Sequence, residues 1–141
     1  MKALTLIQPW ATLIVSGHKR VETRSWRTRH RGPLLIHAGK KIDHDYVEWL
    51  RSIGDPSAPD LEEMPTGAAL GYARLMNVLP TEIFQPRGLE LRYGDYNPDR
   101  FAWCLAGVVA FAEPVPFPGK RGLWTVPRES RTQILLNGRC Q

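Results

Sequence analysis

The longest apolar stretch of the chain, residues 101–112, is about twelve residues long and contains no charged side chain. A helix needs about 20 apolar residues to cross a bilayer, so this stretch is too short to span a membrane. Its length predicts a buried strand of a sheet instead. Prolines at positions 114, 116 and 118 follow the stretch and are expected to end that strand.

Shorter segments on either side predict further strands and helices. Residues 2–7 predict a strand, Pro9 suits the first position of a helix, and Gly17 is placed to end that two-turn helix. Asp43 is a suitable cap for a second helix over residues 44–53. The other predicted elements are strands over residues 20–26, 34–38, 68–79 and 122–126, a surface loop over 55–65, a helical turn at 81–84 and a closing helix over 128–136.

About six strands around two or three short helices, in no repeating strand–helix–strand order, predict an α+β fold. Strands this short and numerous close most easily into a small mixed β-barrel. A length of 141 residues suits one domain, so residues 1–141 are expected to fold as a single unit.

The charge of the chain is positive, with a formal net charge of +5 and a pI near 9.6. This favours a polyanionic partner such as nucleic acid. The basic residues are concentrated in one part of the sequence, whereas residues 55–63 are acidic, so we expect one positive face. The basic positions of that part are Lys19, Arg20, Arg24, Arg27, Arg29, Arg31, Lys40 and Lys41.

The start of the chain resembles a secretory signal, but Gln8, Pro9 and Trp10 interrupt the apolar run and no small-residue cleavage site follows. The protein is therefore expected to be cytoplasmic and to lack a membrane segment. Cys104 and Cys140 do not form a Cys-x-x-Cys pair, and the histidines show no metal-ligand spacing. Neither a metal nor another cofactor is expected.

The segment 17–26 carries the pattern most suggestive of a functional site. Glu22 and Arg24 are two apart on a predicted strand, so their side chains share a face about 6–7 Å apart and could pair. Lys19 follows the helix end and could reach the same face. A carboxylate between two cations stays ionised and positions them, and such cations suit phosphate. The alternative is a row of surface salt bridges of little energetic value.

Several short motifs together resemble the ASCH domain, the activating signal cointegrator homology domain. The resemblance covers most of the chain, from residue 4 to about residue 126. It implies a PUA-like β-barrel, a fold associated with RNA binding and RNA modification, and a cleft beside the first helix. The motifs are Gln8-Pro9-Trp10-Ala11, Gly17-x-Lys19-x-x-Glu22-x-Arg24-Ser25-Trp26, His37-Ala38, Phe101-Ala102-Trp103 and Gly119-Lys120-x-Gly122-Leu123-Trp124.

The resemblance implies more than one activity. Some members of the family are nucleic-acid-binding modules of transcription coactivators, and this chain looks closer to that type. Others are ribonucleases, or resemble amidohydrolases of acetylated cytidine that use a lysine and a threonine. Lys19 matches that lysine. However, Glu22 stands where the threonine would be, and Thr23 is expected on the opposite strand face, which argues against the amidohydrolase.

Three hypotheses follow. The first is a domain that binds RNA rather than DNA, or a nucleotide, in a cleft with Lys19, Glu22 and Arg24 on its wall. The second is a hydrolase of RNA or of a modified nucleoside, with Lys19 as base, Glu22 orienting it and Arg24 holding a phosphate or an oxyanion. The third is a module that binds a protein partner.

Further side chains would extend a nucleic-acid-binding site. Trp10 and Trp26 flank the motif and could stack on bases, although core packing is the alternative for each. His37 could act as an acid or base, or could be a hydrogen-bonded structural residue. The other basic residues expected to contact phosphate are Arg27, Arg29, Arg31 and Lys40.

Overall fold

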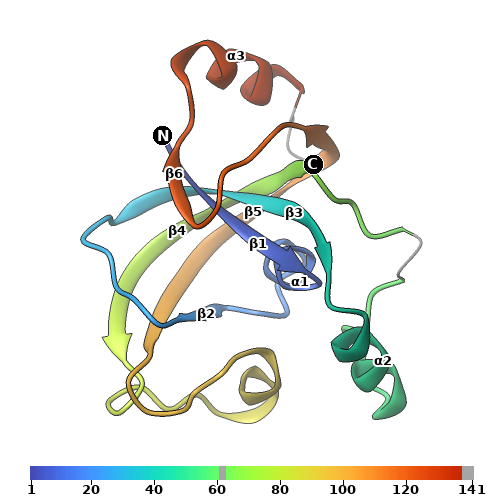
Figure 1. Cartoon of the computed structure of the whole chain (residues 1–141), viewed down its shortest axis with the longest axis vertical. Helices are drawn as coiled ribbons and strands as arrows, with labels where there is room; N and C mark the ends of the chain where they lie inside the picture. The colour runs from blue at the N-terminus through green and yellow to red at the C-terminus, as the bar shows by residue number, and fades with distance from the viewer. Residues whose placement is uncertain (61–62, 138–141) are drawn as a thin grey trace.

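The computed structural model describes residues 1–60 and 63–137, so Cys140 and positions 61–62 of the predicted loop lie outside the described residues. Within them, six strands form one sheet in the order β2-β5-β4-β3-β1-β6 (Figure 1). β1 and β3 are parallel, and the other neighbouring pairs are antiparallel. The strands are β1 (Lys2–Gln8), β2 (Val21–Arg24), β3 (Gly32–Ile42), β4 (Ala68–Pro80), β5 (Phe101–Pro116) and β6 (Leu123–Thr125). The helices are α1 (Trp10–Val15), α2 (His44–Ser52), the 3₁₀ helix η1 (Gly88–Tyr93) and α3 (Arg128–Asn137).

The mixed six-stranded sheet with a few helices agrees with the predicted α+β class, but the predicted closed barrel is wrong. Among the described residues, the two edge strands β2 and β6 do not pair with each other. They have only four and three residues, which offer few backbone hydrogen bonds for closure. Beside β2, the N–H groups of Arg20 and Val21 donate to the Glu90 carboxylate, at 3.0 and 2.8 Å, rather than to another strand.

The apolar stretch forms β5 as predicted, but the strand continues through two of the prolines to Pro116. β2 pairs only with residues 101–104 of β5, so the later part of this edge has no strand partner among the described residues. The Phe117 N–H donates to the Gly67 carbonyl, on the β4 side of the strand. Because successive backbone N–H groups of a strand point to opposite sides, the nitrogens of Pro114 and Pro116 face the open edge. Their missing N–H groups therefore cost no ladder hydrogen bond.

The structure confirms the predicted helix ends where a single residue stops or caps the helix. Gly17 follows α1 with a φ of +86°, as expected of a glycine terminator. Asp43 caps α2, because its Oδ1 accepts a hydrogen bond of 3.0 Å from the Tyr46 N–H. Residues 81–84 form a single hydrogen-bonded turn, in which the Phe84 N–H donates to the Pro80 carbonyl at 3.0 Å, whereas η1 was not predicted. η1 is held by contacts with distant segments, which local sequence patterns do not report.

Alternating residues of the strands contribute to two hydrophobic clusters, one on each face of the sheet. Leu4 and Leu34 pack in a cluster with Ile14 of α1. Their neighbours Ala3 and Leu35 belong to a second cluster, which includes residues of the C-terminal segment up to α3. Trp103 is fully buried in the first cluster. None of the helices in the described part of the chain is long and apolar enough to cross a membrane.

His37 is a buried structural residue of the second face rather than part of a site. Its Nε2 lies 2.7 Å from the Phe117 carbonyl, and its Nδ1 lies 3.2 Å from the Thr5 hydroxyl. The Thr5 hydroxyl also accepts a hydrogen bond of 2.9 Å from the Trp124 indole. This arrangement suits a neutral imidazole that donates from Nε2 and accepts at Nδ1. Burial accordingly lowers the pKa of His37, although the hydrogen bond to Phe117 opposes the shift.

We predict that His37 makes the fold sensitive to mild acid. Because its pKa is lower in the folded state, the unfolded chain binds the extra proton first, so the free energy of unfolding falls as pH drops below about 6.5. Denaturant titrations between pH 7.5 and 5 should show a smaller decrease in the free energy of unfolding for His37→Gln than for the wild type. His44→Gln, at an exposed histidine, is the control. Identical pH profiles for wild type and His37→Gln would contradict the assignment.

Candidate functional site

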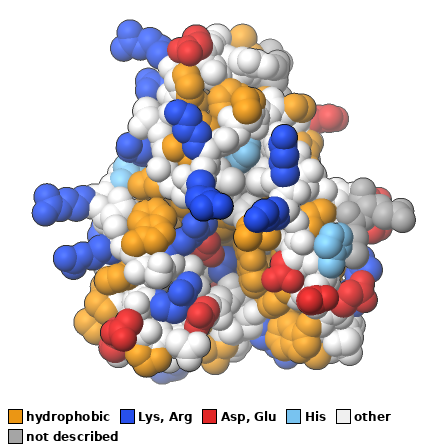
Figure 2. All heavy atoms as spheres, in the orientation of Figure 1, with side chains coloured by type: hydrophobic (Ala, Val, Ile, Leu, Met, Phe, Trp, Pro, Cys, Tyr) orange, Lys and Arg blue, Asp and Glu red, His pale blue; other side chains and the backbone are white. Residues whose placement is uncertain are grey.

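A cavity of about 670 Å³ opens beside the carboxyl ends of the parallel strands β1 and β3. Figure 2 shows one face of the molecule, on which basic side chains gather around a recess near the middle. β2, α1, α2 and the segment from η1 to Arg100 contribute its other walls. The lining residues are Thr5, Leu6, Ile7, Trp10, Glu22, Thr23, Arg24, Gly39, Lys40, Lys41, Tyr46, Arg92, Tyr93, Gly94, Asp95, Arg100, Arg121 and Gly122.

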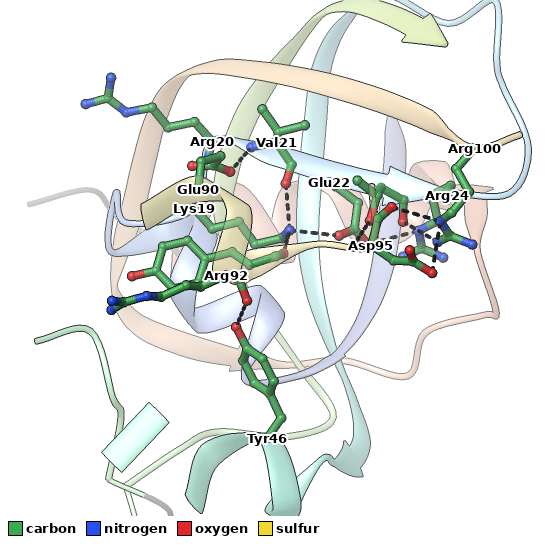
Figure 3. Close-up of polar contacts among 12 residues, drawn as sticks. Lys19, Arg20, Val21, Glu22, Arg24, Tyr46, Glu90, Arg92, Asp95 and Arg100 are labelled. Carbon is green, nitrogen blue, oxygen red and sulfur yellow. Dashed lines mark hydrogen bonds and ion pairs between the residues drawn. The ribbon is translucent and has the colours of Figure 1, made fainter. Parts of the chain in front are cut away.

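The structure brings Lys19, Glu22 and Arg24 together in the arrangement that their spacing suggested (Figure 3). Glu22 Oε1 lies 3.3 Å from Lys19 Nζ, and Glu22 Oε2 lies 3.0 Å from Arg24 Nε. Arg24 also donates to the Thr5 carbonyl at 3.1 Å, which ties β2 to β1. Glu22 and Arg24 line the cavity. The carboxylate thus fixes two cations from opposite sides.

Lys19 lies behind the cavity wall and not on it, which corrects its expected position. Its side chain has no exposed surface. The ammonium donates to the carbonyls of Val21, at 2.6 Å, and Tyr93, and lies 5.3 Å from the centre of the Trp10 ring. Desolvation lowers the pKa of Lys19, and the neighbouring Glu22 carboxylate acts in the opposite direction. An ammonium held by three oxygen atoms in the interior cannot contact a ligand without rearrangement.

Thr23 borders the same cavity as Glu22, although strand alternation predicts opposite faces. The reason is tertiary. The segment after η1 passes beside β2, and the Asp95 N–H donates to the Thr23 hydroxyl at 2.9 Å. The backbone approaches Thr23 closely at Gly94, because a Cβ there would lie 3.1 Å from the Thr23 side chain. Both faces of this short edge strand therefore meet residues that line the cavity.

Trp10 and Trp26 occupy different environments. Trp10 lines the cavity, but its ring packs against Tyr46, with the two ring centres 4.1 Å apart. Trp26 does not line the cavity and is 36% exposed; its ring stands edge-on against Trp103 at 4.8 Å. The Arg24 guanidinium lies 5.9 Å from the Trp26 ring. Trp26 therefore has the more accessible ring surface.

The basic residues named from the sequence divide between the cavity and its surroundings. Lys40 lines the cavity, whereas Arg27, Arg29 and Arg31 are exposed in the loop between β2 and β3 and do not. Sequence reasoning did not assign several lining residues to the site. Two of them had a signal, since Lys41 belongs to the basic part of the sequence and Arg121 lies within the Gly119-Lys120-x-Gly122 motif, but the others come from α2 or from a region without regular patterning. The unassigned residues are Lys41, Tyr46, Arg92, Tyr93, Asp95, Arg100 and Arg121.

η1 is fixed against the rest of the site by buried polar contacts. Tyr46 donates its hydroxyl hydrogen to the Arg92 carbonyl, and Arg92 forms an ion pair of 3.0 Å with Asp55. Asp55 also accepts hydrogen bonds from Ser57 and from the Tyr93 hydroxyl. Burial raises the pKa of Asp55, but these hydrogen bonds outweigh it and hold the pKa at about 2. The carboxylate therefore stays charged and keeps η1 in place at ordinary pH.

Metal binding has no support in the described part of the chain, where no three His, Cys, Asp or Glu side chains are grouped in a way that could hold an ion. The chemistry available in the cavity is that of arginine and lysine cations, two carboxylates and aromatic rings. These groups can hold an anion and present hydrogen-bond donors and acceptors to a planar polar ligand.

Comparison with known proteins identifies the family. The model of the ASCH domain family matches residues 4–114, and the chain belongs to that family. Activating signal cointegrator 1 from Homo sapiens is 31% identical over 128 residues, which are 86% of this chain and 21% of that protein. The mouse protein of the same name is 40% identical over 89 residues, 58% of this chain and 15% of that protein. The chain thus spans about a fifth or less of these relatives.

Solved structures share the fold. The crystal structure of ASCH from Zymomonas mobilis aligns with a TM-score of 0.58 at 18% identity, covering 96% of this chain and 92% of that chain. A mutant form of the same protein aligns with a TM-score of 0.60 at 15% identity, covering 96% of both chains. At this identity the likeness concerns the fold alone.

We predict that replacing Lys19 destabilises the protein strongly, because three buried oxygen atoms hold its ammonium group. Lys19→Met would keep the volume of the side chain, but Glu22 would retain only Arg24 as a cation partner. The Val21 and Tyr93 carbonyls would lose their hydrogen-bond donor. Breaking a buried ion pair from one side costs about 3–5 kcal/mol. Denaturant unfolding should show a loss of this order, whereas Lys40→Met, at an exposed site, should change little. A loss below about 1 kcal/mol would refute this structural role.

Proposed function

We propose that this ASCH domain binds single-stranded RNA and that one nucleotide of the strand occupies the cavity beside β1 and β3. The observation that carries the proposal is the composition of that cavity. Six of its lining side chains are basic and two are acidic, and an aromatic pair, Trp10 and Tyr46, forms part of the wall. Its volume of about 670 Å³ lies within the usual range of ligand sites.

The surface beside the cavity supports a strand rather than a free nucleotide alone. Trp26 is close to the cavity rim, because a Cβ at Gly122, a lining residue, would lie 3.7 Å from its ring. A base that leaves the cavity could stack on the accessible part of this ring. The Arg27–Arg31 loop follows directly in the chain and is exposed, so it could contact further phosphates without reading sequence.

The family relationship supports the same conclusion at a coarser level. The PUA-like fold is associated with RNA, and this association is the basis for proposing RNA over DNA. The relatives named activating signal cointegrator 1 are much longer than this chain, so their partners need not be those of this domain. A protein partner on another surface is compatible with the proposal.

Hydrolysis of RNA or of an acylated nucleoside is a second candidate function. The observation that favours it is the Glu22 carboxylate, which reaches the cavity and is held in a fixed position by Lys19 and Arg24. Such a carboxylate could accept a proton from an attacking water. The burial of Lys19 opposes a direct role of its ammonium as the base, so Glu22 would carry this chemistry.

We predict that Arg24→Gln and Trp26→Ala each weaken RNA binding about tenfold, since one contact to a nucleotide or one stacked base is worth roughly 1–3 kcal/mol. Fluorescence anisotropy with labelled single-stranded RNA of eight nucleotides, at low and moderate salt, measures this. Unfolding curves confirm that each variant is folded. Arg74→Gln removes an exposed arginine that does not line the cavity and should bind like the wild type.

The same samples test the alternatives. DNA of the same sequence should bind more weakly than RNA. Chromatography of the incubated RNA, and of a panel of acylated nucleosides, should recover intact material; product release that Glu22→Gln abolishes would instead make the domain a hydrolase. Absence of salt-sensitive RNA binding by the folded wild type would refute the proposed function.

A further inference from the structure

We infer that the ligand of the cavity is a nucleoside phosphate whose phosphate group binds beside Lys40, Lys41 and Arg121. The base would then lie at the inner end of the cavity, beside Glu22 and Arg24. This inference rests on the proposed function and specifies the ligand class and its orientation. It follows from the unequal distribution of ion pairs among the cations that line the cavity.

The inner cations are already neutralised by carboxylates. Each has a carboxylate at ion-pair distance, so a phosphate that approached them would meet negative as well as positive groups. Lys19, behind the wall, shares the same carboxylate as Arg24. The inner pairs are Arg24 with Glu22 at 3.0 Å, Arg92 with Asp55 at 3.0 Å and Arg100 with Asp95 at 3.5 Å.

The outer cations, which we define as Lys40, Lys41 and Arg121, have no such partner. Within residues 1–60 and 63–137, none of the three forms an ion pair or a side-chain hydrogen bond. All three line the cavity and are exposed. A phosphate monoester carries about −1.5 to −2 charges at neutral pH, which three unpaired cations can balance. Lysine and arginine are the side chains best suited to this group.

The fold brings the outer cations to the same part of β1. Gly39 of β3 lies close against β1, because an added Cβ there would lie 3.2 Å from the Thr5 side chain. The two lysines directly follow this glycine. Arg121 precedes Gly122, whose carbonyl accepts a hydrogen bond of 3.0 Å from the Thr5 N–H. The lysines, from β3, and the arginine, from the turn before β6, therefore flank the same part of β1 from its two sides. An anion above this part of β1 would lie between them.

The inner end offers hydrogen bonds instead of net charge. Each Glu22 oxygen contacts one cation and keeps a further acceptor site, since a carboxylate oxygen has two. Arg24 uses Nε and Nη2 for Glu22 and Thr5, which leaves Nη1 without a partner among the described residues. An acceptor beside a donor, with the Trp10 and Tyr46 rings nearby, suits the polar edge of a base.

Calorimetric titration with nucleosides and their 5′- and 3′-monophosphates tests the inference. We expect at least one monophosphate to bind wild-type protein at least tenfold more tightly than its nucleoside. In Lys41→Gln/Arg121→Gln this difference should fall below threefold, while nucleoside binding is unchanged. Ribose 5-phosphate should show the same loss in this variant. The control, Arg74→Gln/Arg128→Gln, removes the same charge at exposed positions outside the cavity and should retain the preference.

The outcomes separate this inference from the proposed function. Equal binding of nucleosides and monophosphates, or a preference that survives in Lys41→Gln/Arg121→Gln, would overturn the inferred orientation while RNA binding stands. Salt-sensitive RNA binding without detectable binding of any monophosphate would overturn it as well. Absence of both RNA and mononucleotide binding would refute the proposed function and this inference together. A loss of preference that the control variant shares would mean a general charge effect and would also overturn it.

Discussion

The buried ammonium of Lys19 is the interaction on which the site depends. It joins the segment after α1 to β2 and to η1, because it donates to the Val21 and Tyr93 carbonyls and forms an ion pair with Glu22 of β2. A charge without solvent contact is stable only when such partners satisfy it. The same requirement fixes the partners, so η1 is held against β2 and the Glu22 carboxylate is directed toward Arg24. The lysine thus organises the cleft from behind its wall.

Other side chains of η1 also fix this helix against its neighbours. The Glu90 carboxylate replaces a further strand along the edge of β2, and Asp55 holds both Arg92 and Tyr93. These contacts convert a segment without regular patterning into a rigid wall of the cavity. At the edge of β2, the Glu90 carboxylate accepts hydrogen bonds from backbone N–H groups that no further strand uses, and the cavity lies beside this strand.

The distribution of charge in this cavity is more informative than the net charge of the chain. Paired arginines at the inner end serve as positioned donors, whereas the unpaired outer cations remain available to an anion. A net charge of +5 would be compatible with many partners. The separation of hydrogen-bonding groups from free charge along one cavity is what favours a ligand with a polar planar part and an anionic part, which is the chemistry of a nucleotide.

The sequence by itself determined the features that depend on near neighbours: the β5 strand, the Asp43 cap, the Gly17 terminator and the association of Glu22 with Arg24, all of which follow from spacing and residue type. The number and order of the predicted strands and helices indicated the α+β class, and the motifs indicated the family. Only the tertiary structure decided that Lys19 is buried, that Thr23 meets the cavity and that Arg92, Arg100 and Lys41 join it, since these outcomes depend on how residues far apart in the chain pack. The open edge of β2 belongs with them, because the N–H groups of Arg20 and Val21 donate to Glu90, a side chain from a segment with no strand or helix periodicity.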